Sequence, residues 1–432
     1  RGAAAHFHHR QLATANGRRL SSPAMTEIRP FRALRYSPAR GSLEALLAPP
    51  YDVISEESRR ALLARNERNI ARIILKDPED GDRGYARIGE TFARWTGDGT
   101  LVRDEAPAIY LLEQSFAWEG VEYVRTGILA RFKVEAEGST AIRPHEKTRG
   151  PAKEDRFAVL KATRANFSPI FLFFEDPGDF ARAVAAARNA HPELCRYKDD
   201  DGISHTVWAI TDEAHAQALA AAAGAPPSYI ADGHHRYATA QRYLREVGAE
   251  GGVTYGYFCP NDRGLLVLPY HRILFDAPDL STVRARLEGR YLLNEVAGAE
   301  AAAREVANST LPFAFALLWS SGRALVCESA PGVEDDLPAE APRCLKDLDT
   351  YFLHQAGFRH LGLADPKVEF VHSLAEARAA VAEHPGAAAV LMRATPLRHI
   401  AAVADAQESM PPKSTFFHPK IPSGLLVHPL EA

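Results

Sequence analysis

Apolar and polar positions recur along this chain at two spacings, one typical of helices and one typical of strands. Tyr85, Ile88, Phe92 and Trp95 fall on one helical face, and Gly-Asp-Gly at 97–99 ends that helix. Short alternating or wholly apolar runs predict strands. We expect 109–116 and 121–134 to form a long hairpin, and 253–258 to pair with 265–268. The other strands predicted in this part are 73–75, 170–175 and 204–211.

Helices at 180–190 and 213–223 are interspersed with these strands without a regular strand-helix-strand repeat. We therefore predict the α+β class, with mixed sheets and flanking helices. Beyond residue 275 the chain either forms a second α+β domain or continues the first sheet. We divide it into a core domain at 25–275 and a C-terminal α+β region at 276–432. The elements predicted there are helices at 280–287, 299–306 and 345–354, and strands at 313–319, 324–327, 368–371 and 389–392.

The composition is that of an ordinary globular protein, with 46% hydrophobic and 25% charged residues. The formal net charge of -4 does not favour nucleic acid or a membrane surface as a partner. No apolar run approaches the roughly 18 residues that suggest a membrane span. The 4 cysteines are far apart and form no CxxC pair, as in proteins of a reducing compartment. We therefore expect a cytoplasmic protein without nucleic-acid or membrane partners.

Residues 1–24 contain several arginines and neither Asp nor Glu, and Met25 precedes the first ordered pattern. Such a stretch is either a transit peptide or translated sequence upstream of a natural start at Met25. We expect the second, and the fold prediction therefore begins at residue 25.

The densest polar chemistry lies at residues 228–240, where an apolar strand is predicted to turn into a helix. The turn carries Asp232, Gly233, His234, His235 and Arg236. A helix N-terminus offers unpaired N–H groups and a positive dipole end to an anion. The glycine lets the backbone approach a ligand, and the guanidinium suits phosphate oxygens. The alternative is a helix capped by Asp232, with both histidines on the surface.

A second candidate lies in the loop at 48–55. Two prolines there exclude a helix, and Ser-Glu-Glu at 55–57 starts one. Asp52 therefore sits on a stiff loop ahead of a helix. It is either a general base or metal ligand, or an ordinary turn residue.

The segment 143–166 forms a positive island in a chain of negative net charge. Pro144, Gly150 and Pro151 predict a loop for its first part, and a helix is expected at 157–163. Such a cluster attracts anions and stabilises phosphoryl charge, or it is simply a solvated charged face. Its basic residues are Arg143, Lys147, Arg149, Lys153, Arg156, Lys161 and Arg164, against Glu146, Glu154 and Asp155, with His145 beside them.

The segment 410–425 contains four prolines, which exclude a regular helix, and aromatic residues, which a disordered tail would lack. We predict an ordered arm fixed by Phe416 and Phe417. It either presents polar groups to a ligand or packs to close the domain. We expect the arm and the positive island to meet at the 232–236 turn. The polar residues of the arm are Lys413, Ser414, Thr415 and Lys420.

Four blocks together resemble a bacterial and archaeal family known as domain of unknown function 1015: 48–55, 143–175, 231–240 and 410–425. The turn at 232–236 also resembles the phosphate-binding turn of the ParB/sulfiredoxin superfamily, and free-serine kinases are the most similar members. The resemblance implies a ParB/sulfiredoxin-like nucleotide-binding core, with nucleotide and substrate contacts at Asp232, Gly233, His234, His235 and Arg236. The catalytic cysteine of sulfiredoxin has no counterpart in this turn.

These observations predict a phosphotransferase that phosphorylates a small hydroxyl compound, free L-serine, with ATP or ADP as donor and Mg²⁺ as cofactor. The alternatives are a nucleotide-gated binding protein without turnover, and a metal-dependent hydrolase using His145, His234 and His235. The predicted catalytic residues are Asp52, Glu146, His234 and His235, and Asp232 is the predicted metal ligand. The predicted nucleotide- and phosphate-binding residues are Asp232, Gly233, Arg236, His145, Lys147, Lys153, Arg156, Lys413, Ser414, Thr415 and Lys420.

Overall fold

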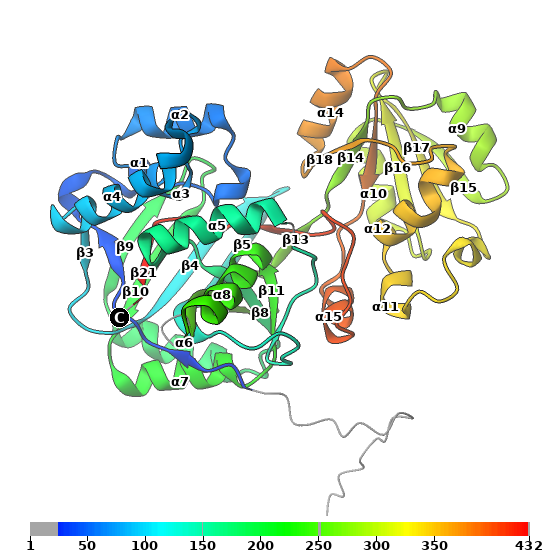
Figure 1. The fold of residues 1–432 in the computed structure, drawn as a ribbon. Helices are drawn as coiled ribbons and strands as arrows, with labels where there is room; N and C mark the ends of the chain where they lie inside the picture. The colour runs from blue at the N-terminus through cyan, green and yellow to red at the C-terminus, as the bar shows by residue number, and fades with distance from the viewer. Residues whose placement is uncertain (1–24, 149, 249–251, 431–432) are drawn as a thin grey trace, which may run out of the picture.

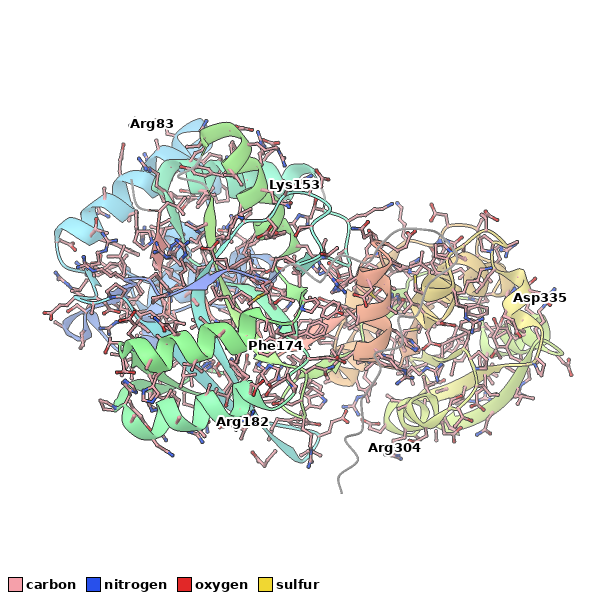
Figure 2. The ribbon with its side chains drawn as sticks, turned by 90° about the horizontal axis from the view of Figure 1, so that it is seen from below. Arg83, Lys153, Phe174, Arg182, Arg304 and Asp335 are labelled. Atoms are coloured by element: carbon pink, nitrogen blue, oxygen red, sulfur yellow. The ribbon has the colours of Figure 1, made fainter. Side chains whose placement is uncertain are left out.

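The computed structural model describes residues 25–148, 150–248 and 252–430, so the predicted leader at 1–24 and Arg149 lie outside the described residues. Two lobes lie side by side, and the C-terminal segment returns from the second lobe to the first (Figure 1). Figure 2 places Phe174 and Arg182 in the first lobe and Arg304 and Asp335 in the second. The mixed sheets and flanking helices confirm the predicted α+β class.

The first lobe is built on a nine-stranded sheet that contains parallel and antiparallel pairs. The hairpin predicted from the alternating pattern is its longest strand pair. The strands, in spatial order, are β6 (Ile142–Arg143), β11 (Ser228–Asp232), β8 (Ile170–Phe174), β12 (Val253–Pro260), β5 (Val121–Lys133), β4 (Ile109–Trp118), β10 (Ser204–Ile210) and β9 (Glu193–Lys198), with β1 (Ile28–Arg29) paired to β5.

Both faces of this sheet are covered, and β8 is buried along its whole length. Successive side chains of a strand point to opposite faces, so Phe171 and Phe173 enter one hydrophobic core while Leu172 and Phe174 enter the other. The second core contains α6 (Asp179–Ala190), α7 (Glu213–Gly224) and α8 (His234–Val247). The first core contains the C-terminal arm and α2 (Glu56–Arg65), α3 (Ala71–Ile74), α4 (Gly84–Gly97), α5 (Gly150–Thr163) and α15 (Leu397–Asp405).

The second lobe contains an antiparallel six-stranded sheet, so the chain does not simply continue the first sheet there. One face is covered by α10 (Ala299–Asn308) and α14 (Leu374–Glu383), and the other by α9 (Leu280–Leu287) and residues 349–361. The strands, in spatial order, are β15 (Tyr291–Ala297), β17 (Arg323–Ser329), β16 (Ala314–Trp319), β19 (Ala388–Met392), β14 (His271–Leu274) and β18 (Val368–Val371).

Three local predictions are wrong. Residues 73–75 lie mainly in α3, because a short apolar run buried on all sides has no periodicity that separates helix from strand. β13 (Leu266–Leu268) pairs with β20 (Phe416–His418) of the arm, and not with β12. The helix predicted at 345–354 is broken into α11 (Arg343–Lys346), α12 (Asp349–Phe352) and a π-helical turn (Leu353–Gly357).

Within the part of the chain that the structure describes, no helix combines the length and the apolar character needed to cross a membrane.

Candidate functional site

The turn at 232–236 joins β11 in the sheet to α8 on its face. Gly233 occupies the N-cap position with φ 94, a left-handed conformation that favours glycine. A Cβ atom at this position would also lie 3.0 Å from the Arg236 guanidinium carbon. The Asp232 side chain makes no capping bond and His234 is buried, so the alternative of an Asp-capped helix with surface histidines is wrong. The first N–H groups of α8 lack intrahelical acceptors.

Asp232 is the point at which two distant cations meet. One carboxylate oxygen accepts from the Lys420 ammonium and the other from the Arg236 guanidinium, which also donates to the Pro169 carbonyl. Burial opposes ionisation, but the charges of Lys420 and Arg236 hold the pKa of the Asp232 carboxyl well below its ordinary value. All three side chains are at most 14% exposed. The cluster therefore has one negative and two positive charges, and its net charge suits an anion.

His234 and His145 form a buried pair behind this cluster, with ring centroids 4.6 Å apart. The backbone N–H of His145 donates to His234 Nε2 at 3.3 Å, which leaves the proton of a neutral ring on Nδ1. Burial lowers the pKa of both histidines to about 3, and their proximity adds to this effect for His145. Both are neutral near pH 7, so His234 is a fixed neutral donor and not a charged phosphate ligand.

Two carboxylates approach the same region from different loops. Glu146 lies with Oε2 3.6 Å from His234 Nδ1, and its side chain is 31% exposed. Asp52 is exposed, in a 3₁₀ turn (Tyr51–Val53). Burial and the nearby charges of Asp232, Asp52 and Glu146 raise the pKa of the Tyr270 phenol. Tyr270 therefore lies within electrostatic range of both candidate bases.

The arm and the positive island meet at the turn, as the sequence predicts. Met410 pairs with the backbone of the island, its N–H donating to the His145 carbonyl at 2.8 Å. Thr415 Oγ1 lies 3.4 Å from His145 Nε2. Lys413 Nζ lies 3.4 Å from the Tyr270 hydroxyl. The arm thus contacts the island and the turn and extends between the two lobes (Figure 1).

Two buried arginines fix the backbone of this arm. Arg125 is 1% exposed and donates to the carbonyls of His418, at 3.1 Å, and Pro419. Arg272 is 0% exposed and donates to the carbonyl of Lys413 at 3.1 Å. These contacts place Lys413 and Lys420 at defined positions.

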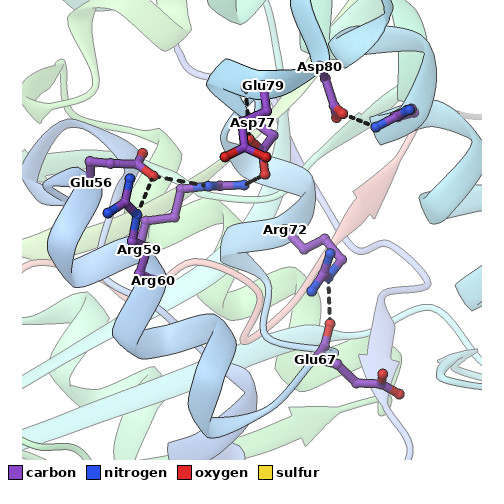
Figure 3. A network of polar contacts seen from close by, with 9 residues as sticks. Glu56, Arg59, Arg60, Glu67, Arg72, Asp77, Glu79 and Asp80 are labelled. Carbon is purple, nitrogen blue, oxygen red and sulfur yellow. Dashed lines mark hydrogen bonds and ion pairs between the residues drawn. The ribbon is translucent and has the colours of Figure 1, made fainter.

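The loop that carries Asp52 is held from two sides. The Arg156 guanidinium lies 3.9 Å from the ring centroid of Tyr51, next to Asp52. The following helix α2 is tied to residues 77–80 through Arg59, which is 7% exposed at its side chain and donates to Asp77 at 2.8 Å and to Glu56 at 3.5 Å (Figure 3). Arg156 therefore contacts the turn itself through Tyr51, and the Arg59 network holds the helix that follows it.

A cleft of about 800 Å³ opens beside this cluster. Its lining includes Pro49 and Pro50 of the Asp52 loop, together with Lys413, Lys420 and Tyr270. Side chains of the second lobe complete it, among them Phe370, His372, Ser373 and Glu376. Lys420, which contacts Asp232, thus also lines a space between the lobes that is large enough for a small ligand.

Several predicted site residues have other surroundings. Ser414 is buried: its hydroxyl donates to the Pro411 carbonyl at 2.7 Å, and its Oγ lies 3.0 Å from Thr350 Oγ1, so its contacts lie within the fold. Lys147 is exposed, and Lys153 lies on α5 in the first lobe (Figure 2). The predicted loop ends at Gly150, because proline is tolerated in a first helical turn.

The predicted metal ligands do not form a metal site in the described residues. Both oxygens of Asp232 already accept from Lys420 and Arg236, so this carboxylate does not fit as a Mg²⁺ ligand. Over residues 25–148, 150–248 and 252–430, no group of three or more His, Cys, Asp or Glu side chains could hold a metal ion. His145 contacts both His234 and Thr415 of the arm.

Tyr270 and Tyr51 are site residues that the sequence did not indicate. Both are aromatic residues beside a proline or a charged residue, a pattern common on any surface. Their placement depends on long-range contacts with Lys413 and Arg156, which a single sequence does not reveal.

Comparison with known proteins gives one family match. The model of a family described as a protein of unknown function, DUF1015, matches residues 28–351. No curated protein matches the chain.

Solved structures give weak likenesses. A free serine kinase in complex with AMP shows 15% identity and a TM-score of 0.32, over 64% of this chain and 83% of the other. A conserved hypothetical protein from Pyrococcus furiosus shows 16% identity and a TM-score of 0.31, over 66% of this chain and 90% of the other. SbnI with a C-terminal truncation, from Staphylococcus aureus, shows 10% identity and a TM-score of 0.33, over 68% of this chain and 84% of the other. At these values the likenesses carry no argument about activity.

Proposed function

The chain belongs to the DUF1015 family, and from the geometry of its site we propose that it transfers a phosphoryl group from a nucleotide to a small hydroxyl compound. ATP or ADP is the proposed donor, and free L-serine is the proposed acceptor. The observation that carries the proposal is the meeting of Lys420 and Arg236 on Asp232 at the N-terminus of α8.

This arrangement suits phosphates for three reasons. The helix N-terminus directs N–H groups and a positive dipole end toward the turn. The Lys420 ammonium has three N–H donors, and its contact with Asp232 uses one. Lys420 lines the cleft, and the burial of the cluster strengthens its charges relative to water.

Phosphoryl transfer requires positioning and charge stabilisation more than covalent catalysis by the protein. In the proposed reaction the acceptor hydroxyl oxygen bonds to the terminal phosphorus, the bond to the bridging oxygen breaks, and the shortened nucleotide leaves. The hydroxyl proton passes to a carboxylate, for which Asp52 and Glu146 are the two candidates. Neutral His234 lies beside Glu146 without competing for that proton. Mg²⁺, if bound with the nucleotide, would neutralise phosphate charge.

A second candidate function is nucleotide-gated binding without turnover. It is favoured by the contacts of Asp232, because an arriving phosphate competes with this carboxylate for Lys420 and Arg236. Nucleotide binding would then loosen or shift the arm that carries Lys420, with no product formed.

One experiment separates the two functions. Purified protein is incubated with ATP or ADP, Mg²⁺ and a panel of hydroxyl amino acids, and the products are identified by mass spectrometry. Phosphoserine together with the shortened nucleotide supports the kinase. Nucleotide binding without any phosphorylated product supports the gated binding protein, and the absence of nucleotide binding refutes both.

A further inference from the structure

One wall of the cleft between the lobes is formed by aromatic rings. We call the set Phe116, Trp118, Phe416 and His418 of the first lobe and His372 of the second the aromatic wall. The His372 and Phe416 rings stack at 4.3 Å with an interplanar angle of 18°. Trp118 and His418 lie with centroids 4.9 Å apart, and Phe116 and His418 with centroids 5.4 Å apart. Trp118, His372 and His418 are half-buried, so the wall is accessible from the cleft.

Groups of opposite charge line the same cleft as the aromatic wall. Lys420 Nζ lies 5.0 Å from the Phe416 ring centroid and also contacts Asp232. Acidic residues 199–201, between β9 and β10, also line the cleft. Burial lowers the pKa of His418 to about 4, and the charge of Asp199 raises it while that of Lys420 lowers it. His418 therefore lies within electrostatic range of both groups, and the cleft contains charges of both signs.

This polarity fits one orientation of a nucleotide. Phosphates belong near Lys420 and away from the carboxylates at 199–201, because like charges repel. A planar base has a π face that stacks on aromatic side chains, and ribose hydroxyls and exocyclic amino groups donate to carboxylates.

We propose that the aromatic wall binds the base of the nucleotide, with the ribose toward residues 199–201 and the phosphates toward Lys420. The inference rests on the proposed function, because it assumes that the phosphates occupy the turn at 232–236. It adds that the base, and not the acceptor, occupies the wall, and that Trp118 at the end of β4 is a stacking residue.

The test compares a ligand that has a base with one that lacks it. Binding of ADP and of inorganic pyrophosphate to the full chain is measured by calorimetry for the wild type and for Trp118→Ala. Loss of one stacking contact should weaken ADP binding about tenfold and leave pyrophosphate binding unchanged. Equal weakening of both ligands, or unchanged ADP binding, overturns the base site. A wild type that binds neither ligand refutes the proposed function itself.

A conservative variant protects the test against misfolding. Trp118 is one of 4 tryptophans, so its fluorescence can be isolated by substitution. ADP should quench the emission of the wild type and of the control Trp319→Phe, which removes a tryptophan of the second lobe. The quenching should disappear in Trp118→Phe, which keeps an aromatic ring and should bind ADP within a few fold of the wild type. Quenching that persists undiminished in Trp118→Phe contradicts the proposal.

Discussion

Lys420 donates to the Asp232 carboxylate across 188 residues of sequence. This contact joins the arm, which follows the second lobe, to the turn between β11 and α8 in the first lobe. Arg236 donates to the other oxygen of the same carboxylate. One buried carboxylate therefore holds two cations at a helix N-terminus. The three side chains together carry one net positive charge, which favours a phosphate.

Replacement of Lys420 should weaken nucleotide binding without unfolding the first lobe. A hydrogen bond to a charged group contributes about 1.5–3 kcal/mol, so Lys420→Ala should lower the affinity for ADP by roughly 10- to 100-fold. Calorimetry measures the dissociation constant, and Lys367→Ala, an exposed lysine of the second lobe, is the matched control. Unchanged ADP affinity in Lys420→Ala would exclude its ammonium from phosphate binding.

The two candidate bases can be separated by isosteric variants. Asp52→Asn and Glu146→Gln each remove one proton acceptor and keep the side-chain shape. The variant that lacks the base should lose about 10²- to 10⁴-fold in kcat for phosphoserine formation, with little change in nucleotide affinity. If both variants keep most of the wild-type kcat, neither carboxylate accepts the proton.

Stability should fall at acidic pH because several histidines are buried in the neutral form. Burial lowers the folded-state pKa of His145, His234 and His428 to about 3. Between about pH 6.5 and pH 3 the unfolded chain therefore binds more protons than the folded chain, and the free energy of unfolding decreases as pH falls. Each histidine contributes at most about 1.4 kcal/mol per pH unit in this window.

Urea unfolding at pH 7.5, 6.5 and 5.5 measures this dependence. His234→Asn should reduce the slope of the free energy of unfolding against pH below 6.5, and exposed His384→Asn serves as the matched control. A slope identical to that of the wild type in His234→Asn would contradict its neutral, buried state.

Arg125 should be important for stability because it satisfies buried carbonyl groups of the arm. Arg125→Met leaves the His418 and Pro419 carbonyls without this donor, and should lower the free energy of unfolding by about 2–4 kcal/mol. Urea denaturation measures the loss. Lys133→Met, at the exposed end of the same strand β5, should change stability by less than about 0.5 kcal/mol. Equal stability of the two variants would show that the Arg125 contacts contribute little.

The sequence predicted the turn and the arm because each has a local signature. Glycine at 233 followed by helical spacing indicates a strand-to-helix turn, and prolines with phenylalanines indicate an ordered, non-helical arm. The prediction that they meet came from charge, because a triphosphate carries more negative charge than Arg236 and one helix N-terminus could balance. The contact of Lys420 with Asp232 itself was not predicted.

The sequence did not predict what depends on long-range pairing. An apolar run such as 266–268 shows that a strand is buried but does not identify its partner, which is the arm and not β12. Tyr270 is indicated as a candidate site residue only by its contact with Lys413 and by four carboxylates within electrostatic range. Burial lowers the pKa of His145 and His234. A polar sequence motif gives no sign that these side chains are buried.

The most direct test of phosphoryl transfer at the 232–236 turn is the rate of phosphoserine formation by the wild type and by Arg236→Lys, measured by mass spectrometry with ATP or ADP and L-serine. A lysine keeps the charge but loses the planar two-pronged donor, so we predict turnover by the wild type, a drop of roughly tenfold or more in the variant, and an unchanged melting temperature. A variant that forms phosphoserine at the wild-type rate, or a wild type that forms none while binding nucleotide, would contradict the assignment of phosphoryl transfer to this turn.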